Sequence, residues 1–166
     1  MPGEPSLFSA ADYTFMAEAI RLAEKGLYTT SPNPRVGCVI VKNHQIIGRG
    51  WHEKAGQPHA EINALKQAAS EVKGSTVYVT LEPCCHYGRT PPCTDALINA
   101  GIAKLIIAAQ DPNPRVAGKG IKQLKAAGIE VQYGLLEAQA NQLNSGFASR
   151  MTRQRPRITV KIASSL

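Results

Sequence analysis

The sequence predicts an α/β domain in which a mixed, mostly parallel sheet lies between two layers of helices. Two observations support this class. From residue 46 onward, short apolar runs rich in β-branched residues alternate with stretches of helical periodicity. Before them, two apolar runs at 36–41 and 46–51 are separated by four polar residues, which is typical of a hairpin. Alternating strands and helices favour βαβ crossovers, and crossovers give parallel strands covered on both faces.

The first helix is indicated by a start signal and a period. Ser9 and Asp12 have the spacing of a capping box, and apolar residues then recur at helical spacing as far as Leu27. Gly26 marks an expected end. The hairpin follows, and Cys38, inside its first strand, is expected to be a small buried side chain rather than a ligand.

The alternating part has a glycine or proline at most of its boundaries. Gly74, Gly101 and Gly128 mark the ends of three expected helices, and Pro91 and Pro92 precede the second of them. The expected helices cover residues 59–73, 91–100, 121–127 and 136–147, and the expected strands cover 76–81, 105–109, 129–133 and 157–162.

The net charge of +7 does not by itself indicate a nucleic-acid partner. Residues 150–166 hold five basic residues and no acid, so residues 1–149 carry 14 basic against 12 acidic side chains. The excess is therefore a basic tail, which is more typical of a solvated linker. No apolar run approaches the ~18 residues that span a membrane. The chain has four cysteines and no apolar signal segment, so we expect reduced thiols and a cytoplasmic location.

The residues that carry chemistry lie between His59 and Cys93. His59 and Glu61 form a His-x-Glu pair, and Pro83-Cys84-Cys85 follows one strand later. One imidazole and two thiolates can hold zinc and leave a fourth position for water, and a nearby glutamate can move that water's protons. His-x-Glu with Pro-Cys is the pattern of the zinc-dependent base deaminases, although here eight residues separate Cys84 from Cys93. Spacing alone leaves either Cys84 or Cys85 as the second ligand.

A resemblance narrows this choice. The segments 31–42 (SPNPRVGCVIVK), 48–61, 81–93 (LEPCCHYGRTPPC) and 110–120 (QDPNPRVAGKG) resemble the deaminase half of the bifunctional riboflavin-biosynthesis deaminase/reductase. The resemblance implies the three-layer α/β/α fold of the cytidine-deaminase-like proteins. It also implies one Zn²⁺ per chain held by His59, Cys84 and Cys93, with Glu61 as the catalytic acid and base.

The same resemblance implies the substrate, a diaminohydroxyphosphoribosylaminopyrimidine that loses ammonia to give an aminouracil phosphate. It implies that Asn33, His52, His86 and Arg89 bind this pyrimidine ribose-phosphate. Glu82 could orient the ligand loop through backbone N–H bonds, or could be a plain exposed carboxylate. We expect a homo-oligomer, with neither nucleic acid nor a membrane as partner.

The expected domain organisation has three parts. Residues 1–12 would be a flexible lead, 13–150 the zinc deaminase domain, and 151–166 a basic linker with the first strand of a truncated reductase domain. By the resemblance, NADPH would bind only in that missing reductase domain. Two other hypotheses compete with this one: a nucleoside or nucleic-acid base deaminase, and a non-catalytic zinc module in which Cys85 is a fourth ligand.

Overall fold

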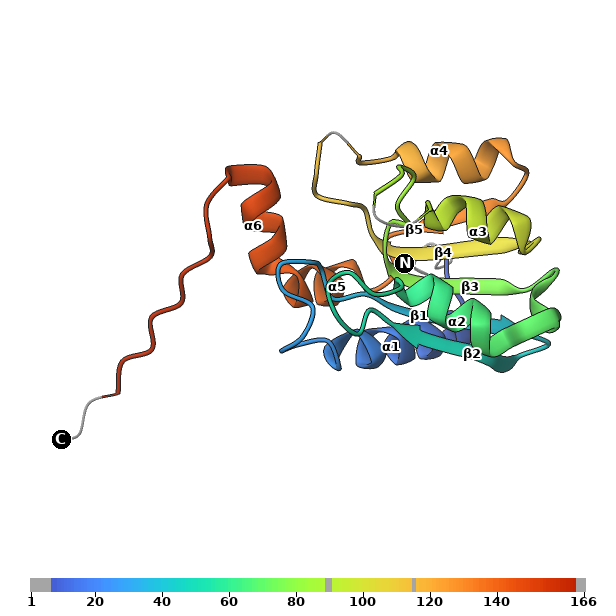
Figure 1. The fold of residues 1–166 in the computed structure, drawn as a ribbon. Coiled ribbons are helices and arrows are strands. Elements are labelled where there is room, and N and C mark those ends of the chain that lie inside the picture. Colours follow the sequence, from blue (N-terminus) through green and yellow to red (C-terminus); the bar gives the residue numbers. More distant parts are fainter. Residues whose placement is uncertain (1–6, 89–90, 115, 164–166) are drawn as a thin grey trace, which may run out of the picture.

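The computed structural model describes residues 7–88, 91–114 and 116–163. Its elements follow the order helix, hairpin, and then alternating helices and strands (Figure 1). The strands are β1 (Gly37–Lys42), β2 (Gln45–Trp51), β3 (Thr76–Leu81), β4 (Lys104–Ala109) and β5 (Glu130–Tyr133). The helices are α1 (Ala10–Glu24), α2 (Ala60–Ala68), the 3₁₀ turn η1 (Ala69–Val72), α3 (Cys93–Asn99), α4 (Lys119–Ala126), α5 (Glu137–Leu143) and α6 (Ser145–Arg153).

The five strands form one mixed sheet in the order β2-β1-β3-β4-β5. β1 pairs antiparallel with both β2 and β3, while β3, β4 and β5 pair in parallel. Four of these strands therefore run in one direction and only β1 runs against them, which confirms the predicted mixed, mostly parallel sheet. The described part of the chain contains no helix long and apolar enough to cross a membrane.

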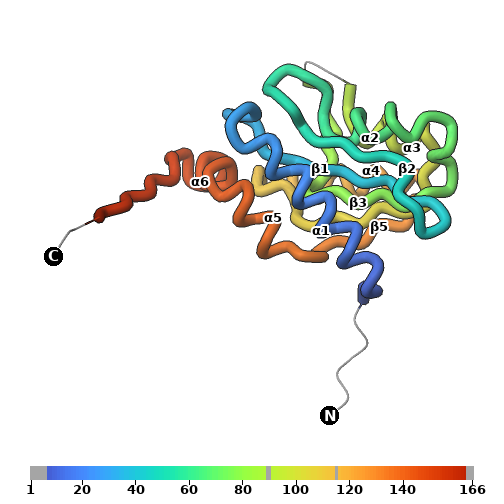
Figure 2. Tube along the Cα trace, turned by 90° about the horizontal axis from the view of Figure 1, so that it is seen from below, coloured from blue at the N-terminus to red at the C-terminus, as the bar shows by residue number. Residues whose placement is uncertain are grey.

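The sheet has a hydrophobic core on each face, because side chains alternate along each strand. Figure 2 shows α2, α3 and α4 on one side and α1 and α5 on the other. Along β4, Leu105 and Ile107 pack in the first core, while Ile106 and Ala108 pack in the second. All four side chains are fully buried. This arrangement confirms the predicted three-layer α/β/α sandwich.

The start of α1 confirms the predicted capping box. The Ser9 backbone N–H donates to Asp12 Oδ2 at 2.8 Å, and the Asp12 N–H donates to Ser9 Oγ at 3.2 Å. The first turn of α1 therefore includes residues 10–12, which were expected to belong to the flexible lead. The helix ends at Glu24, so Leu27 lies beyond it and is partly exposed rather than on its buried face.

Three other boundaries differ from the sequence prediction. The helix after His59 becomes a 3₁₀ turn at Ala69, whose φ is 49°. The last predicted helix is two helices, because Asn144 at the junction is held by the distant Arg35 backbone: its amide accepts the Arg35 N–H and donates to the Arg35 carbonyl, both at 2.8 Å. Residues 157–162 form no strand, and their apolar side chains are exposed, because no strand of the described residues lies beside them.

The close packing of α2 on β2 depends on Gly50. A Cβ at this position would overlap the carbonyl oxygen of Ala60 and lie 2.5 Å from the backbone nitrogen of Ala64. Any side chain here would therefore push α2 away from the sheet, and His59 and Glu61, at its start, would move with it.

We expect Gly50→Ala to lower the free energy of unfolding by about 1–3 kcal/mol, since overpacking a close backbone contact forces the backbone to shift. Gly146→Ala is the matched control, because no heavy atom lies within 4 Å of a Cβ there and alanine is favoured over glycine in a helix. Urea unfolding of the three chains measures both effects. Equal stability of Gly50→Ala and the unchanged chain would contradict this packing.

Candidate active site

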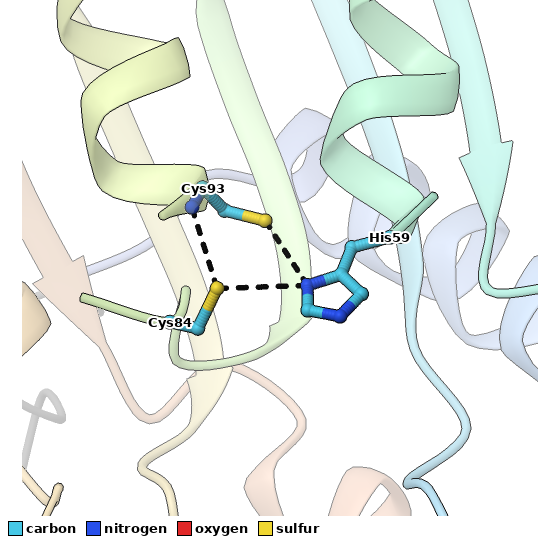
Figure 3. Close-up of side chains that lie close together, drawn as sticks. All are labelled: His59, Cys84 and Cys93. Atoms are coloured by element: carbon cyan, nitrogen blue, oxygen red, sulfur yellow. Dashed lines mark hydrogen bonds between the residues drawn. The ribbon is translucent and has the colours of Figure 1, made fainter. Parts of the chain in front are cut away.

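Three candidate ligand atoms converge at one end of the sheet (Figure 3). His59 is the N-cap of α2, Cys93 is the first residue of α3, and Cys84 lies in the loop after β3. The Nδ1 of His59 lies 3.2 Å from Cys93 Sγ and 3.5 Å from Cys84 Sγ. Among the described residues, the candidate ligand atoms of these three side chains all lie within 4.8 Å of one another, as the donors of one metal ion would.

The two helix starts explain why this cluster favours negative sulfur. The backbone N–H of Cys93, at the N-terminus of α3, donates to Cys84 Sγ at 3.3 Å. A hydrogen bond from the Cys93 thiol, another from His59 and this backbone contact lower the pKa of Cys84 to about 4. The same hydrogen bond, then burial and the negative charges of Glu61 and Cys84, raise the pKa of Cys93. A negative charge on one sulfur therefore disfavours ionisation of the other. A cation bound between them would allow both thiols to ionise.

Glu61 is a buried acid beside this cluster. Its side chain is only 3% exposed and belongs to the first turn of α2. Burial and then the negative charge of Cys84 raise the pKa of Glu61 to about 7, against an ordinary value of 4.5. Such a carboxyl group can both accept and release a proton near neutral pH.

His52 fixes the orientation of Asn33. The Nδ1 of His52 lies 3.2 Å from the Pro58 carbonyl oxygen, so this nitrogen carries the proton and donates. The Nε2 of His52 then accepts from Asn33 Nδ2 at 3.2 Å. Burial lowers the pKa of His52, which agrees with a neutral ring. This hydrogen bond fixes the orientation of the Asn33 amide, whose oxygen accepts no hydrogen bond from the residues that the structure describes.

Two adjoining cavities surround these side chains. The inner one has a volume of about 200 Å³ and is lined by His59, Glu61 and Cys84, together with Asn33, Pro34, Val36, His52, Leu81, Glu82, His86, Asp111 and Phe147. The outer one, about 450 Å³, shares Asn33, His59, Cys84 and His86 with it and extends over residues 55–57 and Gly88. The structure therefore brings together seven of the eight predicted site residues. The eighth, Arg89, lies outside the described residues.

Glu82 is neither exposed nor a direct support of the cysteine loop. It is 4% exposed, and its carboxylate accepts backbone N–H groups from the segment after β4: Asp111 at 3.3 Å, Gly118 at 2.9 Å, Gly120 at 3.0 Å and Ile121 at 3.4 Å. Of the two roles considered for Glu82, backbone binding is confirmed, but its partners are this distant segment. The N-terminus of α4 also approaches so closely that a Cβ on Gly120 would lie 2.5 Å from the Pro83 carbonyl oxygen.

Asp111 and Phe147, which lie outside the motif, also line the inner cavity. Asp111 follows β4 at the carboxyl end of a parallel strand, where α/β sites gather, so the sequence indicated this position but left open whether it contacts the substrate or another subunit. Burial raises the pKa of Asp111. Phe147 comes from α6, more than 50 residues along the chain from Cys93, and no local pattern predicted its place. Cys85 is not part of the ligand cluster.

Comparisons with known proteins agree with this geometry. Residues 9–109 match the family model described as the cytidine and deoxycytidylate deaminase zinc-binding region. The chain is 55% identical to the riboflavin biosynthesis protein RibD of Escherichia coli over 93% of this chain and 42% of that protein. It is 54% identical to a diaminohydroxyphosphoribosylamino-pyrimidine deaminase of Buchnera aphidicola, over 84% of this chain and 95% of that protein.

The solved structures give the same result. Acinetobacter baumannii RibD superposes with a TM-score of 0.85 at 58% identity, over 86% of this chain and 40% of that one. The chain thus spans about two fifths of the length of the RibD relatives it matches.

The cluster predicts that Cys84, and not its neighbour Cys85, holds a metal ion. We expect the unchanged chain to bind one zinc ion, and Cys84→Ser to weaken that binding by at least 100-fold because a thiolate ligand is lost. Cys85→Ser is the matched control and should bind zinc as the unchanged chain does. Zinc content after dialysis and competition with a chromogenic chelator measure this. Equal losses in both variants, or a loss only in Cys85→Ser, would contradict the assignment.

Proposed function

We propose, from the premise that the chain belongs to the zinc-binding cytidine and deoxycytidylate deaminase family, that it hydrolytically deaminates diaminohydroxyphosphoribosylaminopyrimidine in riboflavin biosynthesis. The observation that carries the proposal is the buried Glu61 beside three convergent candidate ligands. Its relatives named for this activity include one whose length the chain covers almost completely.

The donor set fits zinc. One imidazole nitrogen and two thiolate sulfurs are ligands that zinc accepts, and three protein donors are typical of catalytic rather than structural sites. In this proposal His59, Cys84 and Cys93 hold the ion, and zinc when bound supplies a Lewis acid that activates water at neutral pH. Since Cys85 is outside the cluster, the closed four-ligand site of a structural zinc module has no support from the described residues.

Glu61 moves the protons in this mechanism. It would accept a proton from the attacking water and deliver it to a ring nitrogen, and it would then pass the remaining proton of the added hydroxyl to the departing amine. A carbon–oxygen bond forms, the carbon–nitrogen bond breaks, and ammonia leaves with the carbonyl product behind. The raised pKa of Glu61 suits a group that takes up and gives back a proton.

The two cavities suit the two parts of the substrate. The inner cavity, of about 200 Å³, suits the pyrimidine ring, and the Asn33 oxygen, turned by His52, can accept from a ring amine. The outer cavity, of about 450 Å³, suits the ribose phosphate, with His86 on its wall and Arg89 next along the chain from Gly88. These substrate roles are part of the proposal.

The activity of a longer protein is also a proposal. The RibD relatives are more than twice the length of this chain, and the expected NADPH-dependent reductase would lie in the part that this chain does not span. A homo-oligomer and a cytoplasmic location remain predictions as well.

We expect Glu61→Gln to lower ammonia release by roughly 10²–10⁴-fold, because the amide cannot accept the proton, while zinc stays bound. Glu71→Gln is the control, since Glu71 is exposed and lies on η1 away from the cavities. Ammonia release from the pyrimidine phosphate, cytidine and adenosine, with and without chelator, provides the measurement.

Two results would contradict the proposal. Full activity or loss of zinc in Glu61→Gln would remove Glu61 from the proton path. Faster release from cytidine or adenosine than from the pyrimidine phosphate would favour a nucleoside deaminase.

A further inference from the structure

We propose that a further cavity, next to the inner and outer ones, binds a small organic phosphate that is not the substrate of the deamination. This cavity has a volume of about 550 Å³, and we call it the arginine pocket because four arginines line it: Arg35, Arg150, Arg155 and Arg157. The inference goes beyond the proposed function, since neither the three candidate metal ligands nor Glu61 lines this cavity.

The arginines of this pocket come from two segments that are distant in the sequence. Arg35 belongs to the loop before β1, and the other three belong to α6 and the residues that follow it. Pro32 lines both the arginine pocket and the outer cavity, and Asn33 lines all three cavities. A ligand in the arginine pocket would therefore lie beside the active site and outside the metal cluster.

The protein does not balance the positive charge of the arginine pocket. No acidic residue of the described chain lines this cavity. Among the described residues, none of its four arginines forms a salt bridge, whereas Arg21 and Arg49 both pair with Glu18. Four like charges around one cavity repel one another, and a bound anion would offset this repulsion.

Two of the guanidinium groups are held at the wall of the pocket. Arg35 donates a hydrogen bond to the Leu143 carbonyl oxygen, and both residues line the cavity. Arg150 donates to the Pro32 carbonyl oxygen at 2.6 Å, and this pair lines it too. A guanidinium group has five N–H donors, so each keeps donors for a ligand. The other two arginines are exposed, and in the described part of the chain their side chains make no hydrogen bond.

The donors and the lining of the pocket favour an organic phosphate. A guanidinium group can bind two phosphate oxygens at once through parallel N–H groups. The apolar residues Leu27, Leu143 and Phe147 also line the cavity and would contact the carbon part of a ligand. The guanidinium carbon of Arg150 lies 5.7 Å from the centroid of the Phe147 ring, so the charged and apolar parts of the wall adjoin.

The size of the pocket agrees with a ligand of its own. Its volume of about 550 Å³ is within the range of ~300–1,000 Å³ that is typical of small-molecule sites. The substrate does not need this space, because the outer cavity of about 450 Å³ suits its ribose phosphate.

The test is calorimetric titration of the zinc-loaded 166-residue chain with phenyl phosphate, which joins a phosphate to an apolar ring. The test variant combines Arg155→Gln with Arg157→Gln, since both residues are exposed and outside every helix and strand, so the fold is kept. The matched control combines Arg153→Gln with Lys122→Gln. It removes the same charge from exposed positions on α6 and α4 that do not line the arginine pocket.

A second titration separates the arginine pocket from the substrate site. Phenyl phosphate is added to Glu61→Gln that is saturated with the diaminopyrimidine phosphate, which this variant binds without turning it over. If the two ligands have separate sites, the Kd of phenyl phosphate is the same with and without the pyrimidine phosphate.

We expect the unchanged chain and the control to bind phenyl phosphate equally, and the test variant to bind it roughly 10–100-fold more weakly, because charge-assisted hydrogen bonds are lost. No binding by the unchanged chain, an equal loss in both variants, or displacement of phenyl phosphate by the pyrimidine phosphate would overturn the inference. Failure of Glu61→Gln to bind the pyrimidine phosphate at all would instead count against the proposed function, and the first titration would still decide the inference.

Discussion

The site depends on the convergence of two helix N-termini and one strand end on the same small volume. His59 begins α2, Cys93 begins α3, and Cys84 follows β3, so each candidate ligand belongs to a different element. Two helix N-termini that point toward the same place favour negative charge there. The hydrogen bond from the Cys93 backbone N–H to Cys84 Sγ is an example of this effect. A divalent cation bound here would stabilise the negative charge further, because it offsets the repulsion between the two thiolates.

The rest of the fold holds this convergence in place by close backbone contacts. Gly50 lets α2 lie directly on β2, and Gly120 lets the start of α4 approach the Pro83 carbonyl oxygen beside Cys84. Glu82 adds a buried carboxylate that gathers four backbone N–H groups from the segment after β4. These hydrogen bonds join the end of the chain segment before Pro83 to the segment after β4, which lines the inner cavity through Asp111.

Local patterns in the sequence were sufficient for most of the fold. The strand at Thr76–Leu81 and the hairpin have strong apolar patterns, and Ser9 with Asp12 marked the start of α1. Other features depend on contacts between distant residues. Asn144 divides the last helix because it binds the backbone of Arg35, 109 residues away. The apolar alternation at 157–162 favours a strand, yet a strand needs a partner edge, and the part of the chain that the structure describes places none beside it. For the site, the motif identified the ligands and Glu61, but Phe147 reaches the cavity only through tertiary packing.

X-ray absorption at the zinc edge, on the full chain loaded with one equivalent of zinc, tests the central claim most directly. The convergence of His59, Cys84 and Cys93 predicts a first shell of two sulfurs at about 2.3 Å and lighter atoms at about 2.0–2.1 Å, one of them an imidazole nitrogen. A shell with three sulfurs would mean that Cys85 closes the site, and a chain that binds no zinc would contradict the account entirely.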